Sequence, residues 1–236
     1  MIDLVTASSP IDLLQQLRTI DISVPLRTEG RTTKQCERWS ICRLLATYSE
    51  TSLLDYPLQV KHEDRPDFVL SMPTVCIGIE ITEAVPENWA RTDAFAQHKG
   101  YDNLRHMERF RPGEPLRSSD EINRLALGQS RGSIWVGDSS EREWAEVMIY
   151  FSLKKIKNYA NPDFRKSQRN WLVIYENWPL PTVEEDKAAS LFHQKLVNLS
   201  GALPFDKIFI ECPKTFWEFT LNSYSCHTIN SLWEES

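Results

Sequence analysis

Apolar residues recur along this chain with two different periods, and each period predicts a different kind of element. The helical period is clear in residues 33–48. The apolar positions there lie three or four residues apart and are Ile41, Leu44, Leu45 and Tyr48. Glu37 lies one turn before this apolar face, so a carboxylate extends it. Thr32 or Thr33 can cap the first turn of the predicted helix.

A period of two, typical of a strand, follows in residues 75–82. One side of this strand carries the isoleucines Ile77, Ile79 and Ile81. The other side carries Cys76, Gly78, Glu80 and Thr82. Residues 68–70 read as a partner strand, joined to it by a turn at residues 71–74. The two strands therefore predict a hairpin.

The turn determines which residues of this hairpin face each other. If it centres between Pro73 and Thr74, Asp67 lies opposite Glu80. Directly opposed residues have Cβ atoms about 5 Å apart. Two carboxylates at that spacing repel unless a cation or a proton lies between them. Mg²⁺ is suited to this place because it takes oxygen ligands and keeps several waters, and Glu37 could face the same spot.

Further along the chain, residues 140–159 predict a long helix. Its inward stripe consists of Trp144, Val147, Met148 and Phe151. The remaining predicted elements are a short helix after Ser9 and Pro10, strands at residues 171–175, 205–211 and 216–221, and a helix at residues 184–198. This order predicts an α/β fold with a central mixed sheet and helices on both faces.

Residues 84–140 lack a sustained period and read as an insertion in a single domain of residues 1–236. One short helix is expected there, at about residues 119–127, ended by Gly128. Residues 98–117 mix basic and aromatic side chains, a composition that suits contact with nucleic acid. Acidic residues interrupt this stretch, which favours a solvated surface instead. The insertion is nevertheless the region expected to contact substrate.

The composition of the chain argues against several classes of function. Only 8 of 236 residues are glycine, and neither glycine-rich phosphate-binding motif occurs. A net charge of −6 gives no overall attraction to nucleic acid or to an anionic membrane, although a local basic patch is compatible with it. The five cysteines form no C-x-x-C pair, which favours reduced thiols and a cytoplasmic protein. The first basic residue is Arg18, which does not fit a secretion signal, and no apolar stretch is long enough to span a membrane.

The acidic residues have the order found in one nuclease family. Pro66 and Asp67 precede one strand, Glu80 lies in the next, and Glu37 lies in the helix before them. This arrangement resembles the PD-(D/E)XK nuclease superfamily, which has the restriction-endonuclease-like fold. In that family a Pro-Asp pair is followed by an acid, any residue and a lysine.

The chain departs from this motif at the lysine, because Thr82 occupies its position. The family lysine orients or activates the attacking water and stabilises charge on the phosphate, and threonine supplies no cation. Some members of the family supply the lysine from a neighbouring helix. Lys155 extends the inward stripe of residues 140–159 and is the first candidate, and Lys154 is the second.

The resemblance implies metal-assisted phosphodiester hydrolysis. Asp67, Glu80 and the carbonyl of Ile81 would hold Mg²⁺ or Mn²⁺, and Glu37 would hold a second metal ion or act through water. The expected substrate is nucleic acid, in the first place DNA. Many nucleases of this family cut duplexes as homodimers, which makes a homodimer the expected assembly.

Two other functions remain open at this point. The chain could keep the fold, lose the activity and bind nucleic acid or a protein partner; the missing lysine favours this. It could also be an unrelated α/β enzyme or scaffold. In that case Asp67 is a turn residue and Glu80 faces solvent at a sheet edge. Glu37 is then simply an acid favoured near a helix start by the helix dipole, and Lys155 extends from a half-buried stripe into water.

Overall fold

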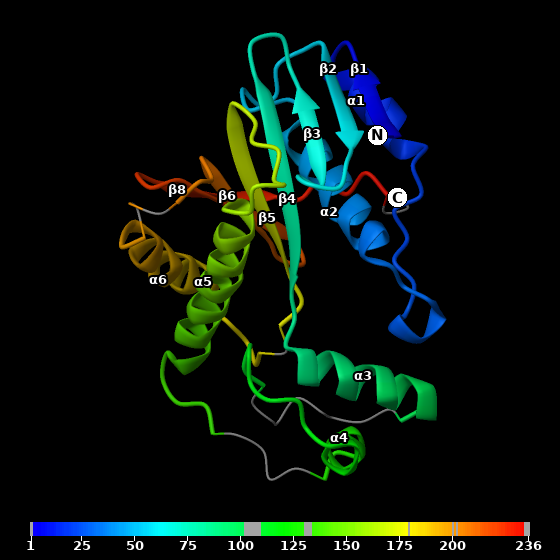
Figure 1. The fold of residues 1–236 in the computed structure, drawn as a ribbon, viewed down its shortest axis with the longest axis vertical. Coiled ribbons are helices and arrows are strands. Elements are labelled where there is room, and N and C mark those ends of the chain that lie inside the picture. The colour runs from blue at the N-terminus through cyan, green and yellow to red at the C-terminus, as the bar shows by residue number, and fades with distance from the viewer. Residues whose placement is uncertain are drawn as a thin grey trace.

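A computed structural model describes residues 2–101, 110–129, 134–178, 180–199, 201 and 203–233. Within these ranges the chain forms six α-helices and one eight-stranded mixed sheet (Figure 1). The strands are β1 (Ile2–Ala7), β2 (Leu58–His62), β3 (Phe68–Ser71), β4 (Cys76–Ala84), β5 (Arg169–Glu176), β6 (Lys207–Glu211), β7 (Thr215–Phe219) and β8 (Tyr224–Thr228). The helices are α1 (Pro10–Arg18), α2 (Thr33–Tyr48), α3 (Glu87–Lys99), α4 (Ser119–Ala126), α5 (Ser139–Tyr159) and α6 (Glu185–Val197). The predicted α/β class is confirmed.

The strands lie side by side in chain order, from β1 at one edge to β8 at the other. The pairs β4–β5 and β5–β6 are parallel and the other pairs are antiparallel. Parallel neighbours need a crossover, and such crossovers are almost always right-handed. Because β4, β5 and β6 succeed one another in one direction across the sheet, α5 and α6 come to the same face.

Two hydrophobic cores lie on the two faces of the sheet. Helices α1 and α2 pack with the isoleucines of β4 on one face. Helices α5 and α6 pack on the other face, where the stripe residues of α5 are buried. Within β5, Trp171 faces the first core and Leu172 the second, as the alternation of a strand requires. Helices therefore cover both faces, as predicted.

The predicted elements recur with small shifts at their ends. Ser9 caps α1, and Thr32 caps α2 through a bond that its hydroxyl accepts from the backbone N–H of Gln35. The sequence did not reveal β1, β2 or β8, which are short and partly polar strands at the two sides of the sheet. All five cysteines are free thiols.

The segment between β4 and α5 contains two helices that pack on each other beyond the end of β4 (Figure 1). Helix α4 matches its prediction, with Ser118 as its cap and Gly128 in the left-handed region just after it. Helix α3 was not predicted, because polar Asn88 and Thr92 are buried on its inner face and interrupt the apolar period. Part of the basic stretch, residues 102–109, lies outside the described residues. No helix in the described ranges has the length and apolar character needed to cross a bilayer.

Candidate active site

The hairpin of β3 and β4 places the two central carboxylates. The register pairs Phe68 with Ile79 and Val69 with Gly78, which is the register expected from the turn, so Asp67 follows opposite Glu80. Backbone pairing between the strands ends at Phe68. The carboxylate Oδ2 of Asp67 then accepts the backbone N–H of Ile81 at 2.6 Å. The side chain thus replaces a backbone partner, which fixes Asp67 beside β4.

A cation reaches these carboxylates from α5. The Nζ atom of Lys155 lies 2.6 Å from Glu80 Oε2 and 3.6 Å from Asp67 Oδ2. The three side chains are mostly buried, with exposed fractions of 16% for Lys155, 7% for Glu80 and 14% for Asp67. Lys155 lies one turn after Phe151 and continues the buried stripe of α5 over β4. The structure therefore brings the lysine inferred from helical periodicity to the two acids inferred from the hairpin.

Glu37, on α2, is a third carboxylate near Asp67, Glu80 and Lys155. Its Oε2 atom lies 3.2 Å from Nε2 of His62, which ends β2. The Glu37 charge also acts on Asp67 and on Lys155. Sequence reasoning missed His62, because β2 was not predicted and nothing else in the sequence connects His62 to Glu37.

The electrostatics of the group follow from burial and from three neighbouring carboxylates. Burial, together with the charges of Glu80 and Glu37, raises the pKa of Asp67 to about 7 against the opposing effects of Lys155 and the Ile81 N–H. Burial opposes the charged form of Lys155, yet Asp67 and Glu80 outweigh it and raise the pKa of the ammonium above its ordinary value. Lys155 therefore stays charged, and its one ammonium does not fully offset the cost of ionising the buried Asp67.

The residues fit a hard divalent cation in charge and in donor type. No group of three or more His, Cys, Asp or Glu side chains in the described ranges is arranged to ligate one metal ion. Mg²⁺ does not require such a group, because it is usually bound by one or two carboxylates together with waters and substrate phosphates. Asp67 and Glu80 supply two carboxylates, and the raised pKa of Asp67 is the property that a second positive charge would reverse.

Of the other candidate residues, only Ile81 contacts the carboxylates within the described part of the chain. Lys154 is exposed, and no bond to the carboxylates is found for it in the described part of the chain. Thr82 is half-buried and lines a neighbouring cavity. Ile81 contributes its backbone N–H to Asp67.

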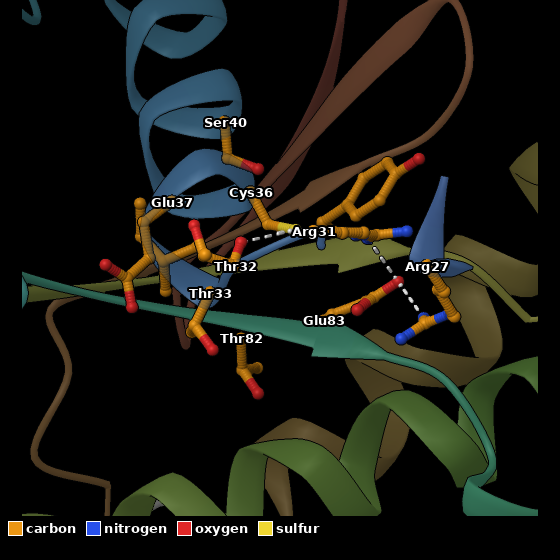
Figure 2. Close-up of a pocket in the computed structure, with 11 residues that line it drawn as sticks. Arg27, Arg31, Thr32, Thr33, Cys36, Glu37, Ser40, Thr82 and Glu83 are labelled. Atoms are coloured by element: carbon orange, nitrogen blue, oxygen red, sulfur yellow. Dashed lines mark hydrogen bonds and ion pairs between the residues drawn. The ribbon is translucent and has the colours of Figure 1, made fainter. Parts of the chain in front are cut away.

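That cavity, of about 130 Å³, opens beside Glu37 at the start of α2 (Figure 2). Besides Glu37 and Thr82 it is lined by Thr33, Arg27, Arg31 and Glu83. The Oε1 atom of Glu83 accepts Arg27 Nη2 at 2.8 Å and Arg31 Nη2 at 2.7 Å. Sequence reasoning missed these arginines, because their partner lies more than 50 positions further along the chain.

The site therefore combines two buried carboxylates, a third nearby, an ammonium between the first two and an arginine-lined cavity next to them. Comparison with models of protein families, with curated proteins and with solved structures finds no match for this chain.

Proposed function

We propose that this protein is a metal-dependent nuclease of the PD-(D/E)XK type that hydrolyses phosphodiester bonds, with DNA as the expected substrate. One observation carries the proposal: Lys155 Nζ lies 2.6 Å from Glu80 Oε2 and 3.6 Å from Asp67 Oδ2. The cation that the strand lacks at Thr82 is thus available from α5. A restriction-endonuclease-like fold, a cytoplasmic location and a homodimer are part of this proposal.

The order of elements also supports it. An acid-bearing helix, α2, precedes the hairpin of β3 and β4, and α5, β5, α6 and β6 follow. The two acids lie where that hairpin meets α5.

Each residue has a role that its contacts suggest. Asp67 and Glu80 would hold Mg²⁺, which would lower the pKa of a water molecule and stabilise charge on the phosphate. Asp67 is oriented for this role by the Ile81 N–H, which its Oδ2 atom accepts. Lys155 stays protonated and donates a hydrogen bond to a phosphate oxygen or to the attacking water. Glu37, which contacts His62, would accept a hydrogen bond from water on the α2 side.

The test is cleavage of a mixed set of nucleic acids at low salt with Mg²⁺ or Mn²⁺. The set contains supercoiled plasmid, linear duplex, single-stranded DNA and RNA. We expect the wild type to cleave at least one of them, and EDTA, Asp67→Asn and Lys155→Met each to reduce the rate at least 100-fold. Lys154→Met removes the same charge from the neighbouring exposed position and should retain the wild-type rate. Cleavage that survives both Asp67→Asn and Lys155→Met would contradict the proposal.

A second candidate is a catalytically silent protein that binds nucleic acid or a protein partner. It is favoured by the position of Lys155, whose ammonium already lies between the two carboxylates and could replace a metal ion. Calorimetric titration with Mn²⁺ separates the two candidates. A nuclease binds Mn²⁺ and loses this binding in Asp67→Asn and Glu80→Gln, whereas a silent site binds none.

A further inference from the structure

We propose that Arg27 and Arg31 form a subsite for a phosphate group of the substrate strand, next to the phosphate that is cleaved. We call this subsite, with Glu83 and Thr33, the arginine pocket. The inference rests on the proposed nuclease function and adds a positioning element to it. It identifies the substrate as a strand long enough to carry a phosphate beyond the reacting one.

The charges in the arginine pocket are unequal. Arg27, Arg31 and the amide of Asn177 all donate to the same oxygen, Glu83 Oε1. Two guanidinium charges therefore share one carboxylate. Arg31 Nε also donates to Cys36 Sγ at 2.9 Å. These bonds use only some of the five N–H donors that each guanidinium carries, and the rest can bind an anion.

The two arginines are held in place before any ligand arrives. The side chain of Arg31 is only 13% exposed and that of Arg27 is 24% exposed. Buried arginines fixed by a carboxylate lose little freedom on binding a phosphate, which favours affinity. Arginine is also the side chain best suited to a phosphate, because its planar donors match two phosphate oxygens.

Helix α2 adds to the attraction. Thr33 begins α2 and lies at the wall of the cavity, as Figure 2 shows. The first turn of a helix presents unpaired N–H groups and the positive end of the helix dipole. Both favour an anion in the cavity that the arginines line.

The cavity has two ends of opposite character. Glu37 lies at one end, close to Asp67 and Lys155, and the two guanidiniums lie at the other (Figure 2). A nucleic acid strand carries one phosphate per nucleotide, so we infer that a strand with its reacting phosphate near Lys155 extends along the cavity past Glu37 and places another phosphate at the arginines. In a protein of net charge −6 such a local cationic site has to provide most of the attraction.

The test measures binding without cleavage. Fluorescence anisotropy in EDTA follows a labelled single-stranded oligonucleotide with the wild type and with Arg31→Gln, Arg27→Gln and Arg18→Gln. Arg18 is exposed at the end of α1 and serves as the control for loss of one positive charge. We expect at least a tenfold loss of affinity for Arg27→Gln and Arg31→Gln, and less than twofold for Arg18→Gln. The slope of log affinity against log salt should fall by about 0.7 when one phosphate contact is lost.

A further variant distinguishes binding from a purely structural role. Glu83→Gln keeps the shape of the side chain and removes the competing charge, so it should increase affinity for the oligonucleotide and for inorganic phosphate. If the arginines only attach residues 27–31 to β4, Glu83→Gln lowers the melting temperature without increasing affinity. That result, or equal affinities for Arg31→Gln and Arg18→Gln, overturns the inference.

Oligonucleotides with and without a terminal phosphate identify the source of the bound group. An arginine effect on both shows an internal phosphate, and an effect on the phosphorylated one alone shows a strand end. The nuclease proposal fails separately. If binding depends on the arginines but no nucleic acid is cleaved in Mn²⁺, the subsite is supported and the nuclease proposal is contradicted. If cleavage depends on Lys155 but the arginine variants bind as the wild type does, only the subsite is contradicted.

Discussion

The chemistry proposed for this protein depends on single side chains whose environments oppose their charges. Lys155 is buried and yet keeps its proton, because Asp67 and Glu80 lie against it. Asp67 is buried among like charges, and the pKa of its carboxyl rises to about 7. The cluster therefore stabilises the charged form of Lys155 and destabilises the charged form of Asp67. Removing the charge of Lys155 should lower the stability of the protein, whereas removing that of Asp67 should raise it.

Removing the cation should destabilise the protein. In Lys155→Met two buried carboxylates lose their partner, and breaking a buried ion pair by removing one member costs about 3 kcal/mol. Urea unfolding of the variant measures this loss. Lys154→Met should stay within about 0.5 kcal/mol of the wild type, as exposed substitutions do, and the double variant Glu80→Gln, Lys155→Met should recover part of the loss. Equal stabilities for Lys154→Met and Lys155→Met would mean that the ion pair contributes nothing.

Asp67→Asn should instead stabilise the protein, by an amount that depends on pH. The carboxyl has a pKa of about 7 in the folded protein against an ordinary value of 3.8, so the folded state binds the proton more tightly. The stability of the wild type should therefore fall as pH rises from about 4 to 7. Relative to the wild type, Asp67→Asn should gain on the order of 2 kcal/mol between pH 5 and pH 8. Thermal unfolding in EDTA tests this, and a gain that is the same at both pH values contradicts it.

At the scale of elements, α2 contributes to both the carboxylate site and the arginine pocket. It presents Glu37 to the carboxylates and begins at the wall of the arginine pocket. Its start is fixed by a capping box, in which Thr32 accepts the N–H of Gln35 and Gln35 accepts the N–H of Thr32. The cap thus connects a local sequence signal to the geometry of the site.

Thr32→Ala should remove this cap. We expect a loss of about 1 kcal/mol in the free energy of unfolding, because the backbone N–H of Gln35 loses the hydroxyl that accepts it. Thr33→Ala, one position later and already inside the helix, should change stability by less than half as much. Chemical denaturation of both variants checks the difference, and similar losses for the two would show that the cap bond is not formed in solution.

The elements also show what could be predicted from the sequence. The register of the β3–β4 hairpin depends on one turn, and the reach of Lys155 depends on the period of α5, so local rules suffice for both. Helix α3 could not be predicted, because buried Asn88 bonds to Glu114 and to the backbone of Arg117, and these partners replace apolar contacts. The arginine pocket depends on contacts between distant segments, for which the sequence offers no period.

For the whole molecule, the charge distribution matters more than the total. The protein carries a net charge of −6, while the proposed substrate contacts are concentrated at Lys155 and the arginine pocket. Few phosphates are then neutralised on binding, and the dependence of affinity on salt should be modest.

We expect affinity for a single-stranded oligonucleotide to fall about five- to tenfold between 50 and 200 mM salt, as expected when about two phosphates are neutralised. Anisotropy titrations at several salt concentrations measure the slope. A much steeper slope would indicate many additional phosphate contacts, and would place substrate binding mainly on other surfaces such as the segment between β4 and α5.

The ion pair between Lys155 and Glu80 joins two parts of the chain that are 75 positions apart. During synthesis the acids are made first, and the lysine follows only after α3 and α4 have been translated. A nascent chain that has formed its β3–β4 hairpin therefore holds the acids without the ammonium. If this protein is a nuclease and the lysine is essential, as proposed, it cannot cleave nucleic acid, including the message being translated, until α5 has docked on the sheet.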